Sequence, residues 1–353
     1  MDNAKFFPFV LKCCIEQSKY YCLKAYCDVK YGMNVAELQE QNPINYREIL
    51  KQQLRPFKIA NSNFIYFLAK NSPNLLDKKR LIQKGFHAWS CAIRAIEFTT
   101  DEEGRPRKIE QIKRLQGSLD GETVWKPLLM ALIMLLHEGG GALEIYLLGQ
   151  GGHENVGQFH SNLSGNVVKK ILAGQVNDLF SDQVQNKQII NSVEKSDLLK
   201  ILDDHHIDQD EIIEPLMVHG IKDYYGINPY ALLCKDEDKL DTQIRTSASE
   251  FAFNRWISRI DRVADGKPSP TVVNELLSGH LVSNRNVATK IDWLLKTIAW
   301  ATDINFTTNK VTWRTLIFPR QMALLKKLLI PYPEDHNLIN EVFNIIDSTV
   351  PKY

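Results

Sequence analysis

Four polar residues in the C-terminal third of the chain have side chains suited to reading a DNA duplex. They lie within a short stretch and are Arg285, Asn286, Thr289 and Lys290. Arginine and asparagine can each make paired hydrogen bonds to purine edges in the major groove, and lysine binds phosphate. We therefore predict that residues 285–314 form a DNA-reading unit.

Basic side chains elsewhere are suited to bind the phosphate backbone. The predicted phosphate contacts are Lys310, Arg314, Arg105, Arg107 and Lys108. A rival interpretation comes from the charge distribution, because residues 178–241 hold 15 acidic and 6 basic side chains while residues 242–330 hold 6 and 13. Under that interpretation the cations form a solvated surface or pair with the acidic stretch, and they bind no ligand.

Two glycine clusters resemble a phosphate-binding loop only superficially. Gly139-Gly140-Gly141 and Gly149-Gln150-Gly151-Gly152 lack the Gly-Lys-Ser/Thr that meets phosphate and Mg²⁺, since His153-Glu154-Asn155 follows the second cluster. A helix stop and a turn are the better interpretations, and we expect no cofactor.

No local spacing of ligand residues predicts a metal site. The acidic run from Asp203 to Asp210 lacks the glycine and glutamate of a calcium loop, and no cysteine pair has Cys-x-x-Cys spacing. Asp28-Val29-Lys30, with Glu16 upstream, is the nearest match to a metal-dependent nuclease, but the segment is helical in pattern. We therefore expect no metal, and the catalytic residues, if any exist, stay unknown.

The predicted DNA-reading unit requires a helix and a hairpin. The pattern predicts a helix from Ser283 to about Ala299, with an apolar face at Val287, Ile291, Leu294, Leu295 and Ile298. Asn309-Lys310 then separates two short apolar runs, which is a hairpin signal. Helices followed by a hairpin are the order of a winged helix.

A similar order is predicted earlier in the chain. Helical periodicity runs over residues 78–96, Ile96–Thr99 alternates like a strand, and a charged turn leads into the basic segment at 105–109. Pro127 begins a strongly apolar helix of about half the length needed to cross a bilayer. We thus predict a mainly α fold with small β-hairpins and tandem winged-helix-like units.

Four regions follow from these patterns. We expect an N-terminal helical domain at 1–75, winged-helix-like units at 76–180, an acidic helical connector at 181–241 and a C-terminal winged-helix-like domain at 242–353. The N-terminus lacks a signal-peptide pattern, so a cytoplasmic protein without membrane association is expected.

The arrangement resembles the DNA-recognition regions of type IIS restriction and nicking endonucleases, which are similar to tandem winged helices. The stretches that carry the resemblance are Ala95–Gly104, Lys126–Gly141 and Asn286–Thr312, about half of the chain. Such enzymes add a nuclease domain, and the sequence offers no match to one.

The expected function is therefore duplex DNA binding, as a recognition subunit of a bacterial restriction or defence system that has no catalysis of its own. A protein partner subunit is a second expected ligand. Two alternatives stay open. One is an adaptor that docks onto partners through its polarised charge. The other is a divergent metal-dependent nuclease with its active site in the first 75 residues.

Overall fold

The structure, a computed structural model, describes residues 43–156, 160–173, 175, 195–219, 228–258, 260 and 263–350. Over these residues the chain is mainly helical and forms no β-sheet, which confirms the mainly α part of the expected fold. The predicted Asp28-Val29-Lys30 segment and the first four cysteines lie outside the described residues.

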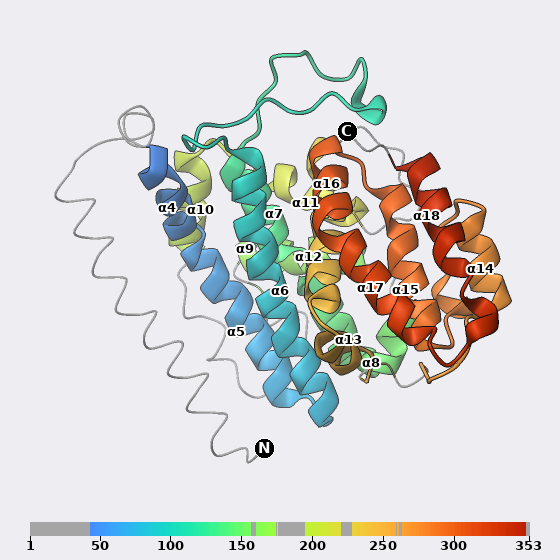
Figure 1. Ribbon diagram of the computed structural model, residues 1–353. Helices are drawn as coiled ribbons and strands as arrows, with labels where there is room; N and C mark the ends of the chain where they lie inside the picture. The colour runs from blue at the N-terminus through green and yellow to red at the C-terminus, as the bar shows by residue number, and fades with distance from the viewer. Residues whose placement is uncertain are drawn as a thin grey trace.

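The first group of helices surrounds one hydrophobic core (Figure 1). Its members are α4 (Pro43–Gln53), α5 (Arg55–Asn71), α6 (Leu75–Thr99), α7 (Pro127–Leu136), α8 (Gly139–Val156), α9 (His160–Ala173), α10 (Lys195–Asp204), α11 (Gln209–Val218) and α12 (Pro229–Ser247). Every residue of α7 is apolar and buried, and the helix packs against α6, α11 and α12. A helix that is apolar on all sides needs this central position.

The apolar stretch Pro127–Gly149 is long enough to cross a membrane by length and composition. Its most apolar window is 100% buried inside the protein, which is the behaviour of a core helix in a soluble protein. The predicted start of this helix at Pro127 is confirmed, with proline in the first turn.

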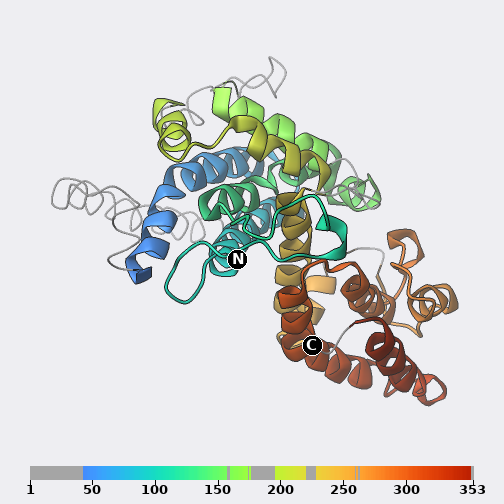
Figure 2. The same ribbon diagram turned by 90° about the horizontal axis from the view of Figure 1, so that it is seen from above.

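The second group of helices surrounds a second core. Its members are α13 (Glu250–Ile257), α14 (Pro270–Leu277), α15 (Lys290–Ala299), α16 (Thr307–Thr312), α17 (Phe318–Leu328) and α18 (Leu338–Thr349), with short 3₁₀ turns η3 (Asn284–Asn286) and η4 (Trp300–Asp303) and a π-helical stretch η5 (Trp313–Ile317). Figure 2 shows α12, in gold, between the two groups. Helix α12 belongs to both, because Leu232 and Leu233 pack in the first core and Leu240 in the second.

A buried carboxylate fastens α12 to the segment after η4. Asp236 accepts hydrogen bonds from the backbone N–H groups of Asn305 and Phe306, at 2.8 to 2.9 Å, and from Asn305 Nδ2 at 2.7 Å. Burial raises the pKa of Asp236 to about 7, against the lowering effect of these N–H groups and of Lys239. The carboxylate is thus ionised in the folded state only near or above neutral pH.

Asp236→Asn is expected to remove one pH-dependent part of the stability. An acid whose folded pKa lies above its unfolded value stabilises the fold at low pH and loses that contribution as pH rises from about 4 to about 7. The unfolding free energy of the wild type, relative to Asp236→Asn, should therefore fall by about 1.4 kcal/mol per pH unit inside that window. Urea unfolding of both proteins at pH 5, 6, 7 and 8 measures it. A difference that is the same at every pH would contradict the assignment.

Neither predicted hairpin is confirmed. Ile96–Thr99 continues α6, where the Thr99 and Thr100 hydroxyls donate to the carbonyls of Ala95 and Ile96. The following residues make a turn in which the Arg107 N–H donates to the Thr99 carbonyl and the Asp101 N–H to the Arg105 carbonyl, but they form no strand beyond isolated antiparallel bridges, Thr100 to Pro106 and Lys108 to Val124. No helix restarts at Glu110, which is followed only by a 3₁₀ turn at Lys113–Leu115. The winged-helix order is therefore not found in residues 75–126.

The second hairpin, at 304–316, is helical as well. Asn309 and Lys310 lie inside α16, and the chain continues through η5 into α17. Trp313 and Ile317 are both buried, so the apolar positions here recur at four residues and not at two. Burial of one helical face therefore has a larger effect here than the two-residue turn signal at Asn309-Lys310.

The helix predicted from Ser283 begins later, at Lys290. Thr289 caps it, because its hydroxyl accepts from the Asp292 N–H while the Asp292 carboxylate accepts from the Thr289 N–H. The five apolar residues predicted to share its buried side are all buried, as expected. Helix α13 ends at Ile257, and its Phe251 is 73% exposed.

Candidate metal centre

Helix α6 presents a line of polar side chains to the groove between the two groups of helices. Arg80, Lys84, His87 and Cys91 recur at intervals of three or four residues, so they lie on one face of the helix. All four are buried or nearly so, among buried apolar residues of the same helix. Buried polar groups in such a line need partners, and other helices supply them.

The end of α7 places two further polar side chains beside that line. His137 follows the last apolar residue of α7, and its Nδ1–H donates to the Met134 carbonyl at 2.5 Å. This bond leaves Nε2 as the lone-pair nitrogen. His137 is 2% exposed, and its Nε2 makes no hydrogen bond to any described residue. A buried imidazole nitrogen of this kind is ready to bind a metal ion.

Glu138 is held by Lys84. The Lys84 ammonium lies 2.8 Å from Glu138 Oε1 and 2.6 Å from Oε2, and Glu138 Oε1 lies 3.5 Å from His87 Nε2. Burial raises the pKa of Glu138, but the charges of Lys84 and the two histidines lower it much further. The carboxylate is therefore ionised.

Helix α12 completes the set with Asp238. Its Oδ1 lies 2.8 Å from His87 Nε2 and 3.8 Å from His137 Nε2, the second distance being too long for a hydrogen bond. Burial raises the pKa of Asp238, but its hydrogen bond with His87 helps to hold the pKa well below its usual range. Asp238 is thus a second ionised carboxylate, beside Glu138 and the two histidines.

Together these four residues form a ligand set. One donor atom each from His87, His137, Glu138 and Asp238 lies within 4.8 Å of the others. Two imidazoles and two carboxylates suit Zn²⁺, Mn²⁺, Fe²⁺ or Co²⁺, which take mixed nitrogen and oxygen ligands. Cys91 forms an overlapping group with the two histidines, but burial and nearby carboxylates raise the pKa of its thiol well above the usual value, which disfavours the thiolate that a metal needs.

His87 is oriented from behind by a third carboxylate. Its Nδ1 lies 2.5 Å from Asp241 Oδ2, while Ser90 Oγ donates to Asp241 Oδ1 at 2.7 Å. Burial lowers the pKa of His87, but its hydrogen bonds with Asp238 and Asp241 outweigh this and raise it above its usual value. Arg245 Nη2 lies 2.6 Å from the same Nδ1, so Asp241 and Arg245 together hold the ring with Nε2 facing Asp238.

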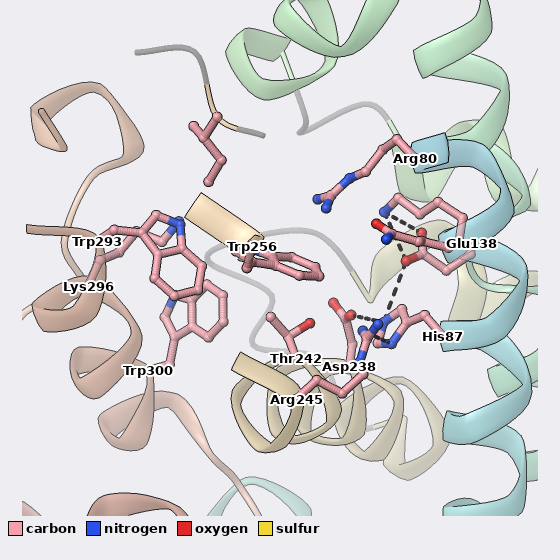
Figure 3. A pocket seen from close by; sticks show the side chains of 13 residues that line it. Arg80, His87, Glu138, Asp238, Thr242, Arg245, Trp256, Trp293, Lys296 and Trp300 are labelled. Atoms are coloured by element: carbon pink, nitrogen blue, oxygen red, sulfur yellow. Dashed lines mark hydrogen bonds and ion pairs between the residues drawn. The ribbon is translucent and has the colours of Figure 1, made fainter. Parts of the chain in front are cut away.

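A pocket of about 180 Å³ lies directly over this cluster (Figure 3). Arg80, Lys84 and Arg245 bring positive charge to its wall, and Arg245 is held by Asp241, with Nε 2.6 Å from Oδ2. Three tryptophans and Lys296 form the opposite wall. The pocket therefore combines ligand atoms for a cation with three cationic side chains.

The predicted DNA-reading residues lie elsewhere. None of them lines the pocket. Arg285 is exposed in η3, Asn286 Nδ2 donates to Glu275 at 2.8 Å, Thr289 caps α15, and Lys290 pairs with Asp265 at 2.7 Å. The long helix expected to carry all four is replaced by η3 and the start of α15.

The predicted phosphate contacts are also mostly paired. Arg314 donates to the carbonyls of Ile346 and Val350 and pairs with Asp347, which gives it a role in holding the C-terminal helix. Arg105 pairs with Asp101 and Glu103, and Lys108 pairs with Glu122. Arg107 is exposed and Lys310 is half-buried. DNA binding by these nine residues stays a prediction.

Sequence reasoning missed the metal cluster because its members are far apart in the chain. His87, His137 and Asp238 come from α6, α7 and α12, so no local spacing joins them. One signal was available. His137 and Glu138 directly follow ten apolar residues that must be buried, and two ionisable groups at the end of a core helix need partners.

Comparisons with protein-family models, with curated proteins and with solved structures gave no match to this chain. The case for function therefore depends on the geometry of the site.

Proposed function

We propose that this chain is a metal-dependent hydrolase of phosphoesters. The observation that carries the proposal is the buried Nε2 of His137, which has no hydrogen bond among the described residues and faces Asp238 Oδ1 at 3.8 Å in a cluster with His87 and Glu138. A buried nitrogen lone pair costs free energy unless a ligand occupies it. A divalent ion is the ligand that two imidazoles and two carboxylates fit.

The charges around the cluster favour a phosphoryl group as the substrate. Arg80, Lys84 and Arg245 face the pocket from α6 and α12 and supply donors for anionic oxygens. Guanidinium groups match the geometry of phosphate oxygens especially well.

The reaction needs only water as co-substrate. The oxygen of water forms a bond to phosphorus, the bond between phosphorus and the leaving alkoxide breaks, and the proton released by water is balanced by protonation of the alkoxide, which leaves as the alcohol. A divalent ion supplies Lewis acidity and acidifies water. Arg80 and Arg245 hold the phosphoryl oxygens, and Lys84 is placed to stabilise charge beside Glu138.

This proposal departs from the expectation of a chain without catalysis. It keeps one element of the sequence-based alternatives, metal-dependent phosphoester cleavage, but places it between α6, α7 and α12 and not in the first 75 residues.

The test is phosphate release by the purified full chain. The chain is stripped with a chelator, reloaded in turn with Zn²⁺, Mn²⁺, Co²⁺, Fe²⁺ or Mg²⁺, and given a panel of phosphomonoesters and phosphodiesters. We expect turnover with at least one metal, loss of turnover on chelation and recovery on reloading. Absence of turnover across all metals and both ester classes would overturn the proposal.

A further inference from the structure

Three tryptophans face the metal cluster across the pocket. Trp256 comes from α13, Trp293 from α15 and Trp300 from the start of η4, so the second group of helices supplies all of them (Figure 3). Trp256 and Trp293 have ring centroids 6.4 Å apart and planes tilted by 48°. The pocket thus has a charged side on α6 and α12 and an aromatic side on the second group.

Core packing does not account for all three rings. Trp293 is 4% exposed and packs edge-on against Phe253, with centroids 5.8 Å apart, so it has a structural role as well. Trp256 and Trp300 are only half-buried, and Trp300 belongs to neither hydrophobic core. A large aromatic side chain that is left at a pocket wall is a common feature of ligand sites.

Each of the three rings has a cation over it. The Arg80 guanidinium is 4.4 Å from the Trp256 centroid, and the Lys296 ammonium is 5.6 Å from Trp293 and 5.2 Å from Trp300. These contacts hold the rings and the cations in fixed positions. A flat, electron-rich ring system that also carries negative charge fits such a wall.

We propose that the aromatic wall binds the base of a nucleoside monophosphate whose phosphate lies at the metal cluster. The inference rests on the proposed function for the phosphate end, and adds the base as the feature that selects the substrate. Stacking of a base on an aromatic side chain contributes about 1–3 kcal/mol and tolerates any base, because every base has a π-face. A sugar phosphate without a base lacks this contact.

The experiment compares adenosine 5′-monophosphate with ribose 5-phosphate. Calorimetric titration of the Mn²⁺-loaded full chain gives the two dissociation constants, and steady-state kinetics give kcat and KM separately. We expect the nucleotide to bind at least about 5-fold more tightly, which is the ratio that the lower end of the stacking range gives. Equal affinity for the two ligands would overturn the base-binding role.

Variants of Trp300 test the ring directly. Trp300→Ala should weaken nucleotide binding about 10-fold and raise KM without a matching loss of kcat, while ribose 5-phosphate binding stays unchanged. Trp300→Phe, which keeps a stacking face, should recover most of the nucleotide affinity. Trp89→Ala is the control, because Trp89 lies on α6 outside the pocket with Lys58 over its ring at 3.9 Å.

The outcomes separate this inference from the proposed function. Equal hydrolysis of both phosphates, with Trp300→Ala like the wild type, rejects the base-binding wall and leaves the hydrolase intact. Preferential nucleotide binding that depends on Trp300, without hydrolysis under any metal, supports the wall and rejects the hydrolase.

Discussion

In the His137→Ala variant, we expect the rate of metal-dependent phosphoester hydrolysis to fall by more than roughly 100-fold. Loss of an outer partner of a metal ligand costs about 10–100-fold, and loss of the ligand itself should cost more. His137 is the one member of the cluster whose ligand nitrogen has no hydrogen bond among the described residues. Its removal takes away a ligand but leaves the ion pair of Lys84 with Glu138. Phosphate release at saturating metal measures the loss, and circular dichroism checks the fold.

Two further variants keep this test decisive. Asp238→Asn preserves the shape of the side chain and removes its charge, so it should lose activity to a similar extent even if His137→Ala perturbs α7. His280→Ala is the matched histidine control, because His280 is exposed and lies outside the pocket. Full activity in either His137→Ala or Asp238→Asn would show that hydrolysis occurs elsewhere.

Gly140→Ala is expected to lower the unfolding free energy by about 3 kcal/mol or more, at the upper end of the cost of overpacking. A Cβ at position 140 would lie 2.0 Å from the His160 carbonyl oxygen and 2.2 Å from the Ser164 nitrogen. Both atoms belong to the backbone of α9, so no side-chain rotation relieves the clash, and α8 and α9 must separate.

The same contact connects Gly140 to the metal cluster. The Gly140 N–H donates to Ser164 Oγ at 3.0 Å, and Ser164 Oγ donates to the His137 carbonyl at 2.5 Å. Separation of α8 and α9 would therefore displace His137 as well. Urea unfolding measures the effect, with Gly121→Ala as the control, because a Cβ there meets nothing within 4 Å. Equal stability of the two variants would contradict the close packing.

Helix positions could be predicted well where the apolar residues can be buried in only one way. The ten apolar residues from Pro127 to Leu136 can lie only in a core, and the five apolar residues of the 287–298 stripe are buried as predicted. In each case the period of the apolar residues and a local start signal agree.

The hairpin predictions were not confirmed because short polar turns carry little information about secondary structure. Asn309-Lys310 is compatible with a hairpin turn and with an exposed helix face, and only the burial of Trp313 and Ile317 decides between them. Ile96-Glu97-Phe98-Thr99 alternates, yet it is the last turn of a 25-residue helix. Tertiary packing outweighs alternation over so few residues.

The candidate site could not be predicted because a metal centre is a property of the tertiary structure. Only ligands close together in the chain are visible in the sequence, and Asp203 to Asp210 is the densest such group. That run spans the end of α10, a turn and the start of α11, whereas His87 and Asp238 are brought together by the packing of α6 on α12. The sequence likewise gives no sign that Arg314 donates hydrogen bonds to the carbonyls of Ile346 and Val350.

The most direct test of the account is the number of metal ions that the chain binds. Equilibrium dialysis against Zn²⁺ or Mn²⁺, followed by elemental analysis, should give one ion per wild-type chain, and one per His280→Ala chain. His137→Ala and Asp238→Asn should retain almost none under the same conditions. A wild-type chain that binds no ion, or His137→Ala and Asp238→Asn chains that bind as much as the wild type, would contradict the metal centre.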